Sequence, residues 1–317
     1  MRTLCLTLAY DGAAYCGWQR QPDGRSLQDV VERALSKFTG ERIHVAASGR
    51  TDARVHAVGQ LVSFHTATDI PVEGFRWGLV TKLPDDIVVR DVVEQPYGFH
   101  ARFDAVRKRY RYVIHSARTP SPFLRNYVWW HRGPLDDRAM QTAADVLVGT
   151  HDFRCFETNW PNRSSSVRTV FEAKWTRCSE WEPWGDGQWS VASGQLLKAE
   201  EGDVSSQLTT DDGLLTNDFL CLDITADGFL YNMVRAIVGT LVHVGRGRWT
   251  ADDVLRILDS GDRRVAGDTA PPQGLYLMEV QTVVDEQRIA ERVARYRARM
   301  ANDQGSMTGE GDLADEP

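Results

Sequence analysis

"TLCLTLAYDG" (residues 3–12) is the stretch from which the fold can be read. Leu4, Leu6 and Leu8 recur at every second position, which is the period of a strand with one buried face, and the stretch ends in an Asp-Gly turn signal. Ser26 then precedes a run whose apolar residues recur at helical spacing as far as residue 38, and Gly40 follows it. The chain therefore begins with a strand followed by an amphipathic helix.

The same reasoning extends along the chain in two rounds. In the first round we predict strands over 59–66 and 86–93 and, between them, a helix over 72–83 that Pro84 stops. The second round contains a helix capped by Asp136 and closed by Gly149. Its other predicted elements are strands over 108–117, 167–178, 218–226 and 275–283, a buried helix over 230–245 and a short helix over 250–261.

Two rounds of similar order predict an α+β protein with two similar sheet-plus-helix halves and mainly antiparallel strands, which can join edge to edge. We place the N-terminal half at 1–105 and the C-terminal half at 106–284. Within the second half, the acidic stretch 180–218 lies between two predicted strands and is predicted to be a hairpin insertion. A helix and a disordered acidic tail follow over 285–317.

Composition narrows the class of protein. A chain of 317 residues that is 42% hydrophobic can bury a sizeable core. The five cysteines are scattered, without a Cys-x-x-Cys pair, so they indicate neither a disulfide framework nor a zinc site. No apolar run is long enough to span a membrane, and the chain reaches Asp11 before a signal-like core is complete. We expect a cytoplasmic protein with reduced thiols and no membrane association.

The net charge of −7 conceals a basic body. Residues 180–218 and 301–317 together contribute −13, so the rest of the chain carries +6. Residues 98–132 hold eight Lys or Arg and the single acid Asp104, and eight aromatic side chains are interleaved with them. Basic groups meet phosphates and aromatic faces stack on bases, so we predict salt-sensitive RNA binding by this stretch. The alternative is a twisted strand pair with a solvated face.

"SGRTDARVHA" (48–57) contains one carboxylate, Asp52, with an arginine two residues away on either side, Arg50 and Arg54. By itself this pattern is typical of an ordinary surface turn. It gains meaning when it is set in order with five other segments. These are "YDGAAYCGWQRQP" (10–22), "FHARFDAVRKRYRY" (99–112), "SSSVRTV" (164–170), "GFLYNMVRAIVGTLVHVGRGR" (228–248) and "TAPPQGLYL" (269–277).

The six segments together resemble the bacterial tRNA pseudouridine synthase A family, which acts on positions 38, 39 and 40 of the anticodon stem-loop. The resemblance implies the pseudouridine synthase fold, a homodimer, tRNA as the partner and an isomerisation that requires no cofactor. It assigns the catalytic carboxylate to Asp52 and its guanidinium partner to Arg235. It also implies that Tyr110 and Leu275 lie against the base, while Arg50 contacts RNA.

Each assignment has an ordinary structural alternative. Arg235 could be an arginine that extends from the edge of a helix to water, Tyr110 and Leu275 could be core residues, and Arg50 could be a surface residue. We interpret His56 as a hydrogen-bonded structural histidine. The rival function is a non-catalytic RNA-binding protein, and a glycosidase-like hydrolase ranks third because no motif places a second carboxylate.

Arg54 departs from the family pattern, which has glycine at this place. Glycine is required where φ is positive or where another chain passes close to the backbone. The remaining motifs are intact, so we predict a negative φ at Arg54 and a side chain that extends towards solvent or an RNA phosphate.

Overall fold

The computed structural model describes residues 1–22, 24–158, 165–181 and 218–303, and the side chains as far as residue 295. The strands of these residues form one ten-stranded sheet, in which eight strands follow the order β4-β1-β3-β10-β5-β9-β8-β7 while β2 pairs with β3 and β6 with β5. The strands are β1 (Arg2–Tyr10), β2 (Ala46–Ala47), β3 (His56–Thr66), β4 (Ile87–Gln95), β5 (Ala105–Ser116), β6 (Trp129–His131), β7 (Gly149–Asp152), β8 (Val167–Cys178), β9 (Asp218–Ala226) and β10 (Leu275–Thr282).

The pairing is mainly antiparallel, as predicted, and the sheet runs through both halves without a break. The halves meet where β10 pairs with β3 in parallel, through Tyr276 with His56 and Leu277 with Ala57. The other parallel pair among the described strands is β5 with β6. The chain is therefore an α+β protein with mainly antiparallel strands, and the edge-to-edge join is confirmed.

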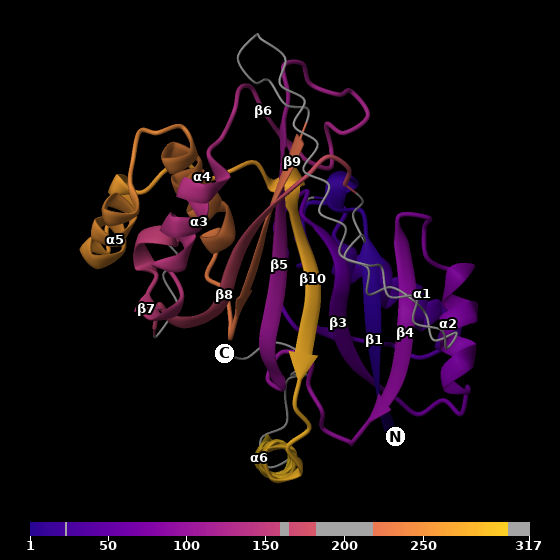
Figure 1. Ribbon diagram of the computed structural model, residues 1–317. Coiled ribbons are helices and arrows are strands. Elements are labelled where there is room, and N and C mark those ends of the chain that lie inside the picture. The colour runs from indigo at the N-terminus through magenta and orange to yellow at the C-terminus, as the bar shows by residue number, and fades with distance from the viewer. Residues whose placement is uncertain (23, 159–164, 182–217, 304–317) are drawn as a thin grey trace, which may run out of the picture.

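Two groups of helices pack on the same face of the sheet. Figure 1 shows α1 (Leu27–Thr39) and α2 (Val72–Val80) on one side of β10 and β5, and α3 (Asp137–Asp145), α4 (Met233–Gly245) and α5 (Ala251–Ser260) on the other. One continuous core lies between these helices and a sheet face lined by alternate residues, such as Leu4, Leu6 and Leu8 of β1. The opposite face carries two smaller clusters, one of which includes Ile289 of α6 (Glu286–Asp303).

Local signals fixed several helix ends. The Ser26 side chain accepts a hydrogen bond from the Asp29 N–H, and Gly40 ends α1 with φ 77°. Asp136 caps α3 as predicted, but the helix ends at Asp145 and Gly149 begins β7 instead of closing a helix. Gly149 has φ 118°, a conformation that favours glycine in a tight turn into a strand.

Two other helices are shorter than predicted. The helix expected over 72–83 ends at Val80, and that expected over 230–245 begins at Met233 because Asn232 has φ 62°. The strands predicted over 167–178 and 218–226 are confirmed as β8 and β9, which pair with each other. Residues 182–217 of the predicted acidic insertion and residues 304–317 of the predicted tail lie outside the described residues. In the described part of the chain, no helix combines the length and apolarity that a membrane span needs.

Candidate active site

The loop between β2 and β3 carries Asp52, and the segment that follows β1 holds this loop from one side. Thr51 accepts a backbone hydrogen bond from the Trp18 N–H at 2.9 Å, and Gly17 forms an isolated β-bridge with Asp52. The hydroxyl groups of Tyr10 and Thr51 lie 2.8 Å apart in the core. The backbone on both sides of the Asp52 side chain is therefore fixed.

Two glycines allow this close approach. A Cβ atom at Gly12 would lie 2.0 Å from the carbonyl oxygen of Val55, and one at Gly17 would lie 2.9 Å from that of Thr51. Gly17 also has φ 113°, which side chains rarely adopt. The segment "YDGAAYCGW" thus supplies the backbone surface on which the Asp52 loop rests.

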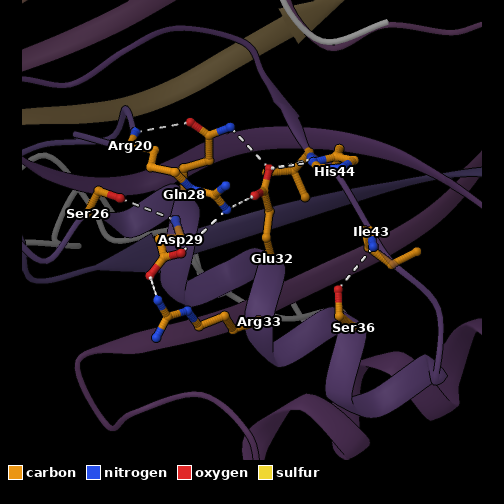
Figure 2. Close-up of polar contacts among 10 residues, drawn as sticks. Arg20, Ser26, Gln28, Asp29, Glu32, Arg33, Ser36, Ile43 and His44 are labelled. Carbon is orange, nitrogen blue, oxygen red and sulfur yellow. Dashed lines mark hydrogen bonds and ion pairs between the residues drawn. The ribbon is translucent and has the colours of Figure 1, made fainter. Parts of the chain in front are cut away.

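A buried carboxylate on α1, that of Glu32, links the helix to the segment after β1 and to the segment before β2 (Figure 2). Glu32 is 3% exposed; its Oε1 atom accepts hydrogen bonds from the Val45 N–H and from Gln28 Nε2, both at 3.1 Å. Its Oε2 atom accepts a hydrogen bond from Arg20 Nη2 at 2.6 Å. Arg20 follows the segment that pairs with Asp52, and Val45 precedes β2, so one side chain holds the chain on both sides of the loop.

Side chains from two strands hold the start of the loop. Lys108 of β5 donates from Nζ to the carbonyl oxygen of Ser48 at 2.6 Å, and Gln60 of β3 donates from Nε2 to that of Gly49 at 2.6 Å. Gln60 also accepts a hydrogen bond from the Ser48 hydroxyl at 2.7 Å. These contacts leave the Asp52 loop little freedom to move.

The structure places Asp52 and Arg235 in contact, although 183 positions separate them in the chain. The Nη1 atom of Arg235 lies 3.3 Å from Oδ2 of Asp52 and 2.7 Å from Oδ1 of Asn232. Its Nε atom donates to the carbonyl oxygen of Ala270 at 2.7 Å. The Asp52 and Arg235 side chains are 22% and 15% exposed, so Arg235 does not extend from the helix edge to water.

Burial has the larger effect on the ionisation of Asp52. Desolvation raises the pKa of Asp52 above its ordinary value of 3.8, and the nearby Arg235 guanidinium opposes this shift without cancelling it. The arginine therefore favours the anion, as the sequence predicts, within surroundings that disfavour any charge. A partly buried carboxylate beside a guanidinium, with a shifted pKa, is an arrangement often found at functional sites.

Tyr110 and Leu275 lie on the neighbouring strands β5 and β10, and Tyr110 is close enough to Asp52 to feel its charge. Tyr110 of β5 is 7% exposed and its ring packs edge-on against Phe229 with centroids 4.9 Å apart. Burial, followed by the charges of Tyr10 and Asp52, raises the pKa of Tyr110, so its hydroxyl stays protonated. Leu275 begins β10, is 6% exposed and pairs with Tyr112 of β5. Tyr112 is fully buried, in keeping with a core role.

Arg54 contradicts its predicted conformation: its φ is 65° rather than negative. The reason lies in the loop geometry. The chain reverses here, with the Val55 N–H donating to the Asp52 carbonyl at 3.1 Å and the Arg54 N–H donating to that of Tyr15 at 3.3 Å. An arginine therefore stands in a backbone conformation that suits glycine.

The side chains near Asp52 in the sequence differ in exposure: two arginines are exposed and His56 is buried. Arg54 and Arg50 are both exposed, and Nη2 of Arg54 lies 3.4 Å from Oδ1 of Asn126. His56 is 2% exposed and stacks on Tyr276 with ring centroids 4.8 Å apart. Its ring nitrogens contact Asp11 Oδ1 at 3.1 Å and the Asn126 carbonyl at 2.9 Å, which agrees with a structural histidine.

Sequence reasoning missed the two groups that orient Arg235. Asn232 carries a signal that could have found it, because asparagine tolerates φ above zero better than most residues and it stands three positions before the arginine. The carbonyl group of Ala270 carries no sequence signal. It reaches Arg235 because residues 268–271 pass so close to α4 that a Cβ atom at Gly239 would lie 1.7 Å from the Asp268 carbonyl oxygen.

The basic stretch 98–132 separates into structural and exposed charges. Arg111 is 8% exposed and forms hydrogen bonds from Nε and Nη2 to the Asp223 carboxylate, the shortest at 2.9 Å. Lys108 is held by the Asp52 loop. The exposed members are Arg102, Arg107, Arg118, Arg125 and Arg132.

Most of the chain is similar in sequence to known proteins that share one description. The profile of a family described as tRNA pseudouridine synthase matches residues 7–104 and 143–282. A protein named tRNA pseudouridine synthase A from Thermoanaerobacter sp. (strain X514) is 39% identical over 280 residues, which cover 88% of this chain and 99% of the relative. Its namesake from Citrifermentans bemidjiense is 41% identical over 281 residues, covering 88% and 97%.

Proposed function

Because the chain belongs to the tRNA pseudouridine synthase family, and is thus an isomerase that acts on uridine in tRNA, we propose that Asp52 is its catalytic carboxylate. We further propose that its targets are positions 38, 39 and 40 of the anticodon stem-loop. The observation that carries the proposal is the contact of 3.3 Å between Asp52 and Arg235 on a rigidly held loop.

The reaction sets what the site must supply. The glycosidic bond from N1 of uracil to C1′ of the sugar breaks, the base turns, and a bond from C5 to C1′ forms. The hydrogen on C5 leaves as a proton, and N1 takes up a proton. Atoms and electrons balance within the nucleotide, so no cofactor is required. A carboxylate is needed either as a nucleophile on the sugar or the base, or as the base that removes a sugar proton.

Each neighbouring residue has a role in this proposal. Arg235 keeps Asp52 ionised and aimed, because its own position is set by Asn232 and Ala270. Tyr110 offers its ring to the extruded uracil and, with its pKa raised, acts as a hydrogen-bond donor rather than a base. Leu275 packs against the same base, and Arg50 contacts the RNA from the exposed side of the loop.

The family resemblance also supports a homodimer that works in the cytoplasm, where its tRNA substrate is found. Both belong to the proposal. Sedimentation of the purified protein at several concentrations would measure its oligomeric state.

The test is tritium release from unmodified tRNA labelled at C5 of uridine. Wild-type protein without added cofactor should release tritium, whereas Asp52→Asn should bind the tRNA and release none, because it keeps the shape of the side chain and removes its charge. Asp69→Asn, which removes an exposed carboxylate outside the site, should behave like the wild type. Stem-loops with a single labelled uridine at 38, 39, 40 or elsewhere would define the target positions.

Two outcomes would contradict the proposal. Normal turnover by Asp52→Asn would remove the catalytic role of Asp52. Tight tRNA binding by the wild type without tritium release on several tRNAs would favour the rival interpretation, a non-catalytic RNA-binding protein.

A further inference from the structure

Residues 117–128, which connect β5 to β6 and are called the arm below, are joined to the Asp52 loop. Asn126 provides two of the contacts: its carbonyl oxygen accepts from His56 Nε2 at 2.9 Å, and its Oδ1 atom lies 3.4 Å from Arg54 Nη2. The Tyr127 hydroxyl donates to Oδ2 of Asp11 at 2.8 Å. The arm is thus held by residues two and four positions from Asp52 and by the segment on which the Asp52 loop rests.

The arm is ordered by its own apolar residues. Leu124, Tyr127 and Val128 pack on the cluster that covers the sheet face opposite α1 to α5. The Tyr127 and Val128 N–H groups donate to the Leu124 carbonyl at 2.9 and 3.1 Å, which forms a turn. In Figure 1 the connection from β5 to β6 lies at the end of the sheet where β5 ends.

The side chain of Phe123, which directly precedes this turn, is exposed to solvent. It is 85% exposed, although its neighbour Leu124 packs on the cluster. A large apolar side chain held out on an ordered loop is an unfavourable arrangement for an isolated molecule, and such residues mark sites of interaction.

The charges around Phe123 indicate the chemistry of the partner. Arg118 and Arg125 of the arm are exposed, as is the neighbouring Arg54. Residues 105–135 contain seven Lys or Arg and no Asp or Glu. An exposed aromatic ring on a loop that also carries exposed arginines, without an acid in the surrounding sequence, suits bases that stack and phosphates that accept hydrogen bonds.

We propose that the arm is a second RNA-contacting element, in which Phe123 stacks on a base of the tRNA close to the extruded uridine while Arg118 and Arg125 contact the backbone phosphates. This rests on the proposed function, since tRNA is taken as the partner. Because His56 ties the arm to the Asp52 loop and Asp11 ties it to the segment beneath that loop, RNA held by the arm is placed in a set position relative to Asp52.

The test measures tRNA affinity and kinetics for substitutions at Phe123. Phe123→Ala should raise Kd and KM for tRNA about tenfold and change kcat by less than about twofold, because stacking holds the RNA and does not take part in the reaction. Phe123→Trp should restore wild-type affinity, whereas Phe123→Leu should not, because it keeps an apolar side chain without a stacking face. Trp77→Ala removes another exposed aromatic side chain, 67% exposed on α2, and should leave Kd unchanged.

The arginines have a separate readout. Replacing Arg118 and Arg125 with Gln should reduce the slope of log Kd against log salt by about 1 to 2, as expected for one or two lost phosphate contacts. An unchanged Kd for Phe123→Ala, or a restoring effect of Leu equal to that of Trp, would overturn the stacking role. A shift of Phe123→Ala from dimer to monomer in sedimentation, with KM unchanged, would assign Phe123 to a contact between copies of this chain.

These results are independent of the catalytic proposal. Binding of unlabelled tRNA tests the arm even if the wild type releases no tritium. Conversely, tritium release by the wild type with unaltered binding by Phe123→Ala would retain the function and reject the arm.

Discussion

Arg54 has a left-handed backbone conformation, which is unfavourable for a residue with a side chain. A left-handed conformation costs a non-glycine residue about 1–2 kcal/mol, and the contact of 3.4 Å with Asn126 is long and exposed, so it offsets little of this cost. We predict that Arg54→Gly raises the free energy of unfolding by about 0.5–1 kcal/mol, since the greater freedom of glycine in the unfolded chain cancels part of the gain. Urea denaturation would measure it.

Gly40→Ala provides the matched control for this prediction. Gly40 has φ 77° and no atom within 4 Å of a Cβ placed there, so the substitution adds backbone strain without a steric clash. It should lower stability by about 1 kcal/mol. A loss of stability in Arg54→Gly as well would mean that the side chain of Arg54 holds the arm more strongly than its geometry indicates.

Asp52 should make the rate depend on pH in a way that Arg235 controls. The pKa of Asp52 is raised by burial and lowered by Arg235, and only the ionised carboxylate is active in the proposed reaction. Activity should therefore fall as the pH drops through a pKa above the ordinary 3.8 of aspartate. Arg235→Met removes the favourable charge, so we predict that the acidic limb of kcat/KM moves to higher pH and that part of the lost rate returns in alkaline buffer.

Tritium release between about pH 4.5 and 9 would measure both profiles, and circular dichroism would show whether the variant remains folded. Arg235→Lys keeps the charge and should place the limb nearer to that of the wild type. The same limb in all three proteins would separate Arg235 from the ionisation of Asp52.

At the scale of elements, α1 supports the site through Glu32. Truncating this side chain leaves the buried Val45 N–H without an acceptor and releases Arg20, so we predict that Glu32→Ala lowers the free energy of unfolding by about 2–3 kcal/mol. Glu32→Gln keeps an acceptor for Val45 and should cost about 1 kcal/mol. Thermal denaturation would measure the two values.

Kinetics of Glu32→Gln can show whether Glu32 only stabilises the fold or also positions the Asp52 loop. If Glu32 positions the segments on both sides of Asp52, Glu32→Gln should lower kcat for tritium release at temperatures where the variant is fully folded, with KM for tRNA little changed. Arg33→Gln, which removes an exposed ion pair with Asp29 on the same helix, should leave kcat unchanged. Equal kcat values in all three proteins would limit Glu32 to a role in stability.

At the scale of the whole molecule, the two halves depend on the short parallel pairing of β3 with β10. Gly59 of β3 makes this join possible, since a Cβ atom there would lie 2.4 Å from the carbonyl oxygen of Met278 in β10. We predict that Gly59→Ala lowers stability by about 2–3 kcal/mol, because the two strands must move apart. Calorimetry would measure the loss.

Gly228→Ala is the control for the join. Its Cβ would meet only the flexible Arg168 side chain, at 3.4 Å or more, so we expect a small change. If Gly59→Ala unfolds at the wild-type temperature, the backbones at the join have more room than the structure indicates.

The sequence by itself determined the long elements and their order, but it did not predict the short strands β2, β6 and β7. Alternation over 3–12 and over 218–226, together with the caps at Ser26 and Asp136, specifies strands and helices through contacts between near neighbours in the chain. The order of six motifs was also enough to indicate the family, which the comparisons confirm.

Only the tertiary structure decided how distant residues meet. The contact of Asp52 with Arg235 joins residues 183 positions apart. Arg111, which belongs to the basic stretch that the sequence predicts to bind RNA, is instead paired with Asp223. The positive φ at Arg54 belongs to a loop in which its N–H donates to the Tyr15 carbonyl. The physical reason is common to all three. Periodicity and capping report the energetics of neighbours along the chain, whereas desolvation, ion pairing and loop conformation depend on which strands and loops pack side by side.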